Sequence, residues 1–81
     1  MNPLQKVIDF IERLRASDIA FRLDSVREAV MVEVMVPGEH WEVEFFPDGH
    51  VEVEVYSSAG SEAGLEDESS LERLFAEGGA E

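Results

Sequence analysis

The stretch WEVEFFPDGHVEVEVY, residues 41–56, decides the fold, because apolar and acidic residues alternate on both sides of a turn signal. Alternation with a period of two predicts β-strands with one buried and one exposed face. Pro47-Asp48-Gly49 suits a three-residue hairpin loop with glycine at the left-handed position. That loop pairs Phe45 with Val51, so that the apolar residues share one face. A two-residue Asp-Gly loop would pair Phe45 with Glu52 and reverse this arrangement, so we reject it.

Two further segments with the same alternation precede this hairpin. They are residues 19–23 and 30–36, separated by a loop at residues 24–28. Pro37-Gly38 makes the preceding turn, and a two-residue loop there pairs Val34 with Trp41. The alternative is a wider loop of four residues, because Pro-Gly prefers a type II turn, and it would keep the same residues on each face. Four strands, each with apolar side chains on one of its two faces, predict an antiparallel sheet with one buried face. Within that face we expect Trp41 to be buried.

The N-terminal segment, residues 2–16, predicts an amphipathic helix. Asn2 is a good N-cap residue, and Pro3 suits the first helical position. Its apolar stripe, with helical spacing and Phe10 at its border, is formed by Leu4, Val7, Ile8, Ile11 and Leu14. We expect this stripe to cover the apolar face of the sheet.

The composition changes after Tyr56. Residues 58–68 are small, polar and acidic, which is typical of a flexible linker. Ser69 followed by Glu72 is a capping-box signal that predicts a short helix over about residues 70–77. Alone in water such a helix is marginal, because it is shorter than the ~12–15 residues usually needed. It must therefore dock on its own sheet, on another copy or on a partner.

Together these segments predict one small α+β domain. The expected fold is a four-stranded antiparallel meander with the N-terminal helix on one face and a short C-terminal helix. The expected organisation is a domain at residues 1–57, a linker at residues 58–68, and a helix and tail at residues 69–81.

The charge of the chain is strongly negative. It has 19 Asp and Glu residues against 6 Lys and Arg residues, a net charge of -13. The interval between Arg27 and Arg73 holds no Lys or Arg at all. Such a field disfavours direct binding to nucleic acid phosphates or to an anionic membrane.

The chain has no cysteine, which excludes disulfides and thiolate metal sites and is compatible with a reducing cytoplasm. The first ten residues lack a basic region followed by an apolar run, so we expect no secretory signal. No apolar stretch approaches the ~20 residues that span a bilayer. We therefore expect a cytoplasmic protein.

The sheet face opposite the valines is predicted to combine carboxylates with large apolar side chains. Its members are Glu33, Glu42, Glu44, Glu52, Glu54, Met31, Met35, Phe46 and Tyr56. Like charges opposite one another on paired strands are destabilising, and only Arg22 is placed to neutralise any of them. Acid mixed with Met and aromatic residues is typical of an interface for a basic, partly apolar partner. The alternative is a solvated face that protects the sheet by charge.

The sequence predicts no metal, cofactor or catalytic site. His40 and His50 are expected at opposite ends of the acidic face, too far apart to share an ion. A flat row of three glutamates lacks the six to eight oxygens of a Ca²⁺ site. The serines in residues 57–61 have no strand-turn-helix elbow, and Gly60 and Gly64 do not form a phosphate loop. We therefore expect a protein that is not an enzyme.

The segment VMVEVMVPGEHWEVEFFPDGHVEVEVYSS, residues 30–58, resembles the core of a family of small uncharacterised bacterial proteins. That family repeats a PGE-x-WEVEF and DG-x-VEVE pattern after an N-terminal amphipathic helix, and the likeness covers about a third of the chain. The family has no established activity, so the resemblance implies no functional residues. Its members often carry Arg at the position of His40 and a basic residue near Val55, so this chain is more acidic.

In charge and size the chain is also similar to acidic immunity proteins and inhibitors that neutralise basic toxins. We therefore expect a non-enzymatic binding protein whose glutamate-rich face engages a basic protein partner, such as a nuclease toxin or a nucleic-acid-binding protein. The alternative is a structural, self-associating domain in which the C-terminal helix completes a homodimer.

Overall fold

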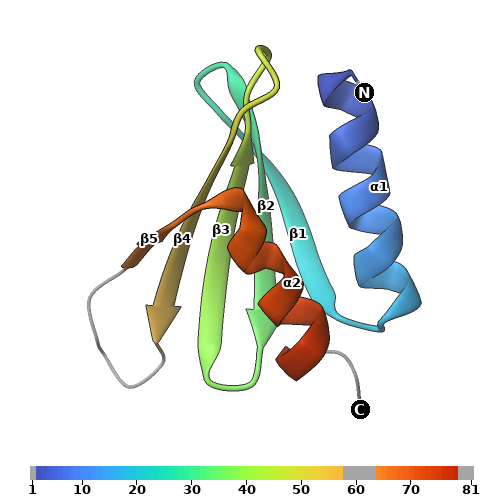
Figure 1. The fold of residues 1–81 in the computed structure, drawn as a ribbon, viewed down its shortest axis with the longest axis vertical. Helices are drawn as coiled ribbons and strands as arrows, with labels where there is room; N and C mark the ends of the chain where they lie inside the picture. Colours follow the sequence, from blue (N-terminus) through green and yellow to red (C-terminus); the bar gives the residue numbers. More distant parts are fainter. Residues whose placement is uncertain (1, 58–63, 79–81) are drawn as a thin grey trace.

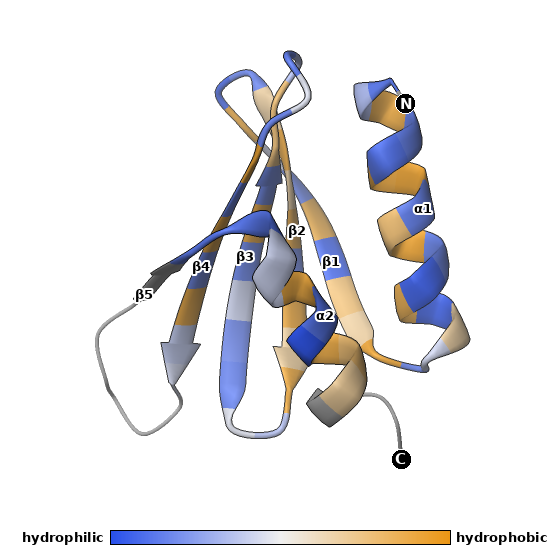
Figure 2. Cartoon of the chain, in the orientation of Figure 1, coloured by the Kyte–Doolittle hydropathy of each residue, from blue (hydrophilic) through white to orange (hydrophobic). Residues whose placement is uncertain are grey.

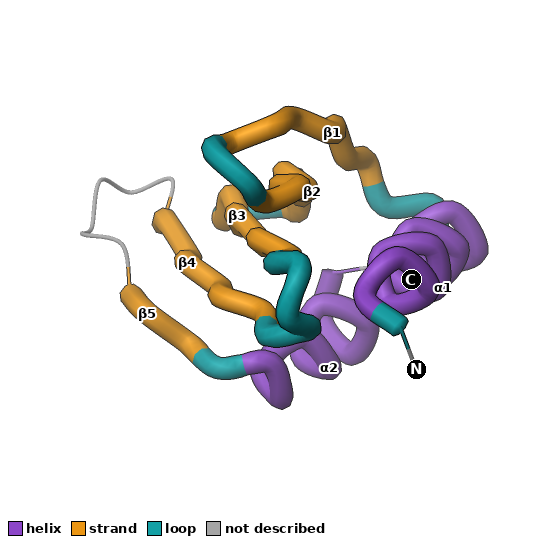
Figure 3. Tube along the Cα trace, turned by 90° about the horizontal axis from the view of Figure 1, so that it is seen from above, coloured by secondary structure: helices purple, strands orange, loops and turns teal. Residues whose placement is uncertain are grey.

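The computed structural model describes residues 2–57 and 64–78, which form one helix, an antiparallel sheet and a short helical segment. Helix α1 (Pro3–Ala16) is followed by strands β1 (Ala20–Val26), β2 (Ala29–Val36), β3 (Glu39–Phe45), β4 (Val51–Ser57) and β5 (Gly64–Glu66). The C-terminal segment comprises η1 (Glu68–Ser70), α2 (Leu71–Arg73) and the π-helical turn η2 (Leu74–Gly78). The strands lie in chain order, and both helical segments cover the same face of the sheet (Figures 1 and 3).

This architecture confirms the predicted α+β fold and its meander of four main strands. The hairpin β3–β4 pairs Phe45 with Val51, and β2–β3 pairs Val34 with Trp41, as predicted. In the β3–β4 loop Gly49 has a φ of 96°, in the left-handed region that favours glycine. Alternating apolar and polar residues along the strands are visible in Figure 2. The turn chemistry and the period of two therefore set the register.

The core lies between the valine face of the sheet and the helical segments. Its fully buried side chains are Leu14, Val32, Val34, Trp41, Val43, Val53 and Leu74. Trp41 is 1% exposed, and its Nε1–H donates to the Glu39 carboxylate at 2.9 Å. The large ring is thus buried while its polar atom is paired, as buried indoles require.

Helix α1 begins as predicted but turns a different side inwards. The Asn2 side chain accepts a hydrogen bond from the Gln5 N–H at 2.7 Å, which confirms the N-cap. Val7 and Leu14 of the predicted stripe cover the sheet as expected, but Leu4 and Ile8 do not, because they are 68% and 42% exposed. The buried residues of α1 are Val7, Phe10 and Leu14.

The C-terminal segment explains this rotation of α1. Phe75 packs against Phe10 with its ring edge-on and the ring centroids 6.0 Å apart. The Arg13 guanidinium donates to both carboxylate oxygens of Glu72, at 2.9 and 3.1 Å. These contacts draw the Phe10 side of α1 towards the C-terminal segment and leave the opposite side exposed.

The C-terminal segment itself starts earlier than predicted. Its N-cap is Asp67, whose Oδ1 accepts hydrogen bonds from the Ser69 N–H at 3.1 Å and from the Ser69 hydroxyl at 2.5 Å. The predicted capping box from Ser69 to Glu72 is therefore wrong, because the 3₁₀ turn η1 precedes α2 and Glu72 pairs with Arg13 instead. Leu71 and Leu74 are buried, so the segment docks on its own sheet.

The sheet is longer at both edges than the sequence predicts. Part of the predicted linker forms β5, in which Leu65 lies opposite Glu54 of β4. This pairing satisfies backbone groups at an edge that would otherwise be open. The remaining linker, residues 58–63, lies outside the described residues.

At the other edge β1 continues to Val26, so the predicted loop at residues 24–28 shrinks to a turn at Arg27 and Glu28. Arg27 takes the left-handed conformation there, with a φ of 55°. No helix in the described part of the chain is both long enough and apolar enough to cross a membrane.

Candidate functional site: the acidic sheet face

The sheet face opposite the helices collects the predicted carboxylates. This acidic face is formed by Glu33 on β2, Glu42 and Glu44 on β3, and Glu52 and Glu54 on β4. The register sets Glu42 opposite Glu54 and Glu44 opposite Glu52, and it sets Glu33 beside Glu42. Strand alternation alone places all five on one face. The structure therefore brings together the five carboxylates that the sequence singles out.

The basic residues of the chain leave most of this face unpaired. Arg22 on β1 donates to Oε1 of Glu33, with its closest nitrogen at 2.8 Å. The ion pairs found among residues 2–57 and 64–78 include no Lys or Arg partner for Glu42, Glu44 or Glu54. Negative charge therefore accumulates over β3 and β4.

Glu44 lies within this accumulation. Its pKa is raised above the ordinary glutamate value, first by partial burial and then by the neighbouring carboxylates of Glu52, Glu54 and Glu42. Arg27 opposes this shift only partly. The free protein thus holds Glu44 in a position that disfavours its ionised form.

The apolar members of the predicted site differ in accessibility. Met31 is buried, with only 7% of its surface exposed, whereas Met35 is 39% exposed. Phe46 is half-buried and stacks on His50 with the ring centroids 4.3 Å apart. Tyr56 is half-buried, and its hydroxyl donates to Glu54 at 3.2 Å. Three of these four side chains therefore reach the surface beside the carboxylates.

Neighbouring carboxylates raise the pKa of two further groups on the face, Tyr56 and His50. The charge of Glu42, followed by burial and Glu54, raises the pKa of Tyr56. His50 lies 2.6 Å from Asp48 through Nδ1 and 3.3 Å from Glu52 through Nε2. The hydrogen bond to Asp48 is the main reason why the pKa of His50 is raised. Protonated His50 would supply one positive charge at the end of the face nearest the β3–β4 loop.

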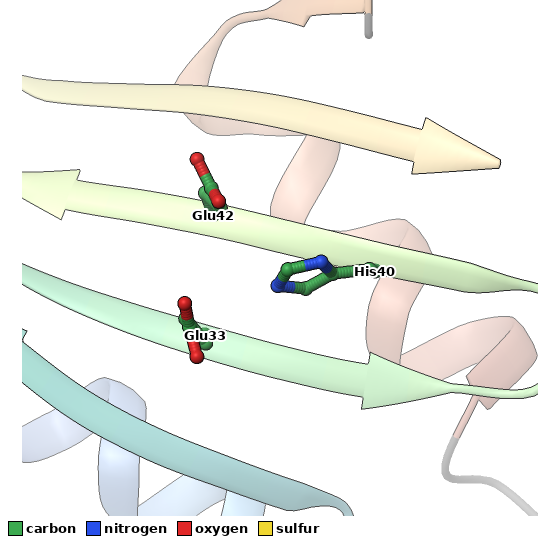
Figure 4. A group of neighbouring side chains, drawn as sticks. All are labelled: Glu33, His40 and Glu42. Carbon is green, nitrogen blue, oxygen red and sulfur yellow. The ribbon is translucent and has the colours of Figure 1, made fainter. Parts of the chain in front are cut away.

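His40 is predicted to lie on this face, too far from His50 to share a metal ion with it, but the sequence interpretation does not group His40 with Glu33 and Glu42. Its Nε2 is buried and has no hydrogen-bond partner among the described residues. Together with one oxygen each from Glu33 and Glu42 it forms a cluster whose atoms all lie within 4.8 Å of one another. Figure 4 shows the ring reaching along the strand towards the two carboxylates. The predicted register could have indicated this cluster, because it places His40 two residues from the paired Glu33 and Glu42 on the same face of the sheet.

No protein-family model matches this chain, and neither does any curated protein or solved structure at a significant level. The function of the acidic face must therefore be argued from its own geometry.

Proposed function

We propose that this protein is a non-enzymatic binding protein whose acidic face engages a basic protein partner. The observation that carries the proposal is the pairing of Glu42 with Glu54 and of Glu44 with Glu52, in the absence of any Lys or Arg partner for Glu42, Glu44 or Glu54 within the described chain. Such an arrangement costs the free protein stability. A partner that supplies positive charge converts this repulsion into attraction.

The chemistry of the face favours arginine-rich surfaces in particular. Arginine can donate two parallel hydrogen bonds to one carboxylate, and its flat guanidinium also packs on aromatic rings. Met35 and Tyr56 provide accessible apolar surface beside the carboxylates. Methionine adapts its shape to a partner at low cost. An immunity or inhibitor role against a basic toxin in the cytoplasm fits these features.

A homodimer completed by the C-terminal helix is the alternative function, and it has less support. Leu71 and Leu74 are buried against the chain's own sheet, and Phe75 packs on Phe10. The apolar side of that segment is therefore already occupied within one chain.

The test is a pull-down from cell lysate with three proteins at low and at high salt. They are the wild type, the double variant Glu42→Gln/Glu52→Gln, and a charge-matched control, Glu12→Gln/Glu28→Gln, whose residues are exposed and lie off the acidic face. We expect the wild type and the control to recover the same basic partner at low salt, and the face variant to recover much less. Equal recovery by all three proteins at both salt levels would refute the proposal.

A further inference from the structure

The end of the acidic face nearest the β2–β3 turn carries a set of side chains that is distinct from the carboxylate rows. Glu33 and Glu42 are direct partners across β2 and β3, and His40 lies two residues before Glu42 on the same face. One oxygen from each glutamate and one ring nitrogen lie within 4.8 Å of one another. Figure 4 shows the imidazole directed at the gap between the two carboxylates.

His40 Nε2 is an exception to the usual pairing of buried polar atoms. The atom is buried and has no hydrogen-bond partner among the described residues, although a nitrogen of the same ring lies within 4.8 Å of two carboxylates. Buried polar atoms are almost always paired, so an exception calls for an explanation such as an ion. The three groups surround a common space rather than bonding to one another.

We propose that Glu33, His40 and Glu42 bind a divalent transition-metal ion, for which Zn²⁺ is the probe. Imidazole nitrogen and carboxylate oxygen are ordinary zinc ligands, with bonds of about 2.0–2.2 Å. Tetrahedral ligands at such distances are about 3.3 Å apart, so small side-chain rotations would close the present cluster onto an ion. Two carboxylates balance the charge of the ion, and the neutral imidazole selects it over Mg²⁺ and Ca²⁺, which prefer oxygen alone.

The surroundings provide access and orientation. An open cavity of 420 Å³ is lined by Arg22, Glu33, Met35 and His40, so two of the three proposed ligand residues border space through which an ion and water can enter. Both hydrogen bonds from Arg22 go to Oε1 of Glu33, which leaves Oε2 available as the ligand atom. Hydrogen bonds from residues that do not themselves bind the metal orient the side chains that do. The ring of Tyr56 lies against that of His40, with centroids 5.8 Å apart, and restricts its orientation.

This inference goes beyond the proposed function and does not depend on it. The metal uses the carboxylates of only one end of the acidic face, and its binding is measured without any protein partner. Failure of the pull-down would therefore not count against the metal site. Failure of zinc to bind would likewise not count against the acidic face as a protein-binding surface.

Isothermal titration with a zinc salt tests the site. The proteins are the wild type, His40→Gln, Glu42→Gln and the control His50→Gln, each first shown by circular dichroism to be folded. His50 is a matched control, because it lies on the same face but both of its ring nitrogens already face carboxylates. We expect one equivalent of Zn²⁺ to bind the wild type and His50→Gln equally, and the affinity of His40→Gln and Glu42→Gln to fall at least about tenfold.

An NMR titration supplies a second readout, in which the ring signals of His40 should shift at one equivalent of Zn²⁺ while those of His50 stay in place. The proposal is overturned if the wild type shows no saturable binding, if His40→Gln binds as tightly as the wild type, or if His50→Gln is the variant that loses binding. It is also overturned if Mg²⁺ at equal concentration displaces the Zn²⁺, since the histidine would then contribute no selectivity.

Discussion

Glu42 on β3 lies directly opposite Glu54 on β4, and within the described chain neither carboxylate has a Lys or Arg partner. Glu44 and Glu52 repeat the arrangement two residues further along. Side chains directly opposite on antiparallel strands are close enough to interact, so these pairs repel. The fold tolerates the repulsion because the opposite face of the same two strands buries Trp41, Val43 and Val53 completely.

Removing one charge from each pair should stabilise the free protein. We expect Glu42→Gln/Glu52→Gln to raise the free energy of unfolding by about 0.2–1 kcal/mol for each relieved pair at low salt. The gain should shrink as salt is added, because exposed charges are screened. Urea denaturation at two salt concentrations measures it, with Glu12→Gln/Glu28→Gln as the control. Destabilisation by the face variant would show that these carboxylates make favourable contacts.

The raised pKa of Glu44 predicts a pH-dependent effect of one substitution. Because the folded state raises this pKa above the unfolded value, the cost of ionising Glu44 is absent at low pH and is complete once the pH exceeds the folded pKa. Glu44→Gln should therefore stabilise the protein at neutral pH and give no gain below the ordinary glutamate pKa. Unfolding curves of wild type and variant across this range measure the difference. A gain that stays constant with pH would contradict the electrostatic explanation.

The burial of Trp41 predicts a large loss on truncation. An aromatic side chain of this size buries about 150–250 Å², and Trp41→Ala should cost about 3–5 kcal/mol of unfolding free energy. Chemical denaturation measures the loss. An unchanged unfolding midpoint would mean that the register of β3 is wrong.

The docking of the C-terminal segment predicts a contrast between two leucines. Leu74 is 1% exposed and Leu4 is 68% exposed, although both are leucines of helical segments. Leu74→Ala should destabilise the protein by about 2–5 kcal/mol, whereas Leu4→Ala should change little. Thermal unfolding of the two variants side by side measures this contrast. Equal effects would show that the segment does not pack on the sheet in solution.

The same docking bears on the oligomeric state. With Leu71, Leu74 and Phe75 engaged within one chain, we expect a monomer across the micromolar range in sedimentation velocity. A concentration-dependent dimer that Leu74→Ala abolishes would favour the alternative of a self-associating domain.

The strand pattern was predictable because a period of two, two proline-glycine turn signals and the valine spacing all agree on one register. The predictions that were wrong concern segments where tertiary contacts outweigh the local sequence pattern. The side of α1 that faces the core depends on Phe75, which lies 65 residues further along the chain than Phe10. Likewise β5 forms because β4 offers an open edge, although residues 64–66 carry no strand pattern of their own.

The acidic face was predictable for the same reason as the strands, since alternation alone collects its carboxylates. The solvent accessibility of its individual side chains was not predictable from the alternation. Met31 follows the same alternation as Met35, yet it is buried while Met35 is exposed. The grouping of His40 with Glu33 and Glu42 was not predicted, because strand pairing gives only the residues that lie directly opposite one another. A long side chain can also lean along its strand towards residues that are not its direct partners.

The most direct test of the central claim is the association rate of the basic partner recovered in the pull-down, measured by stopped flow over a range of salt concentrations. If the acidic face is the binding surface, the rate for the wild type and for Glu12→Gln/Glu28→Gln should fall steeply with salt. The rate for Glu42→Gln/Glu52→Gln should be lower at low salt and should depend less on it, because charge complementarity acts mainly on encounter. Identical rates and identical salt slopes for the three proteins would contradict the account.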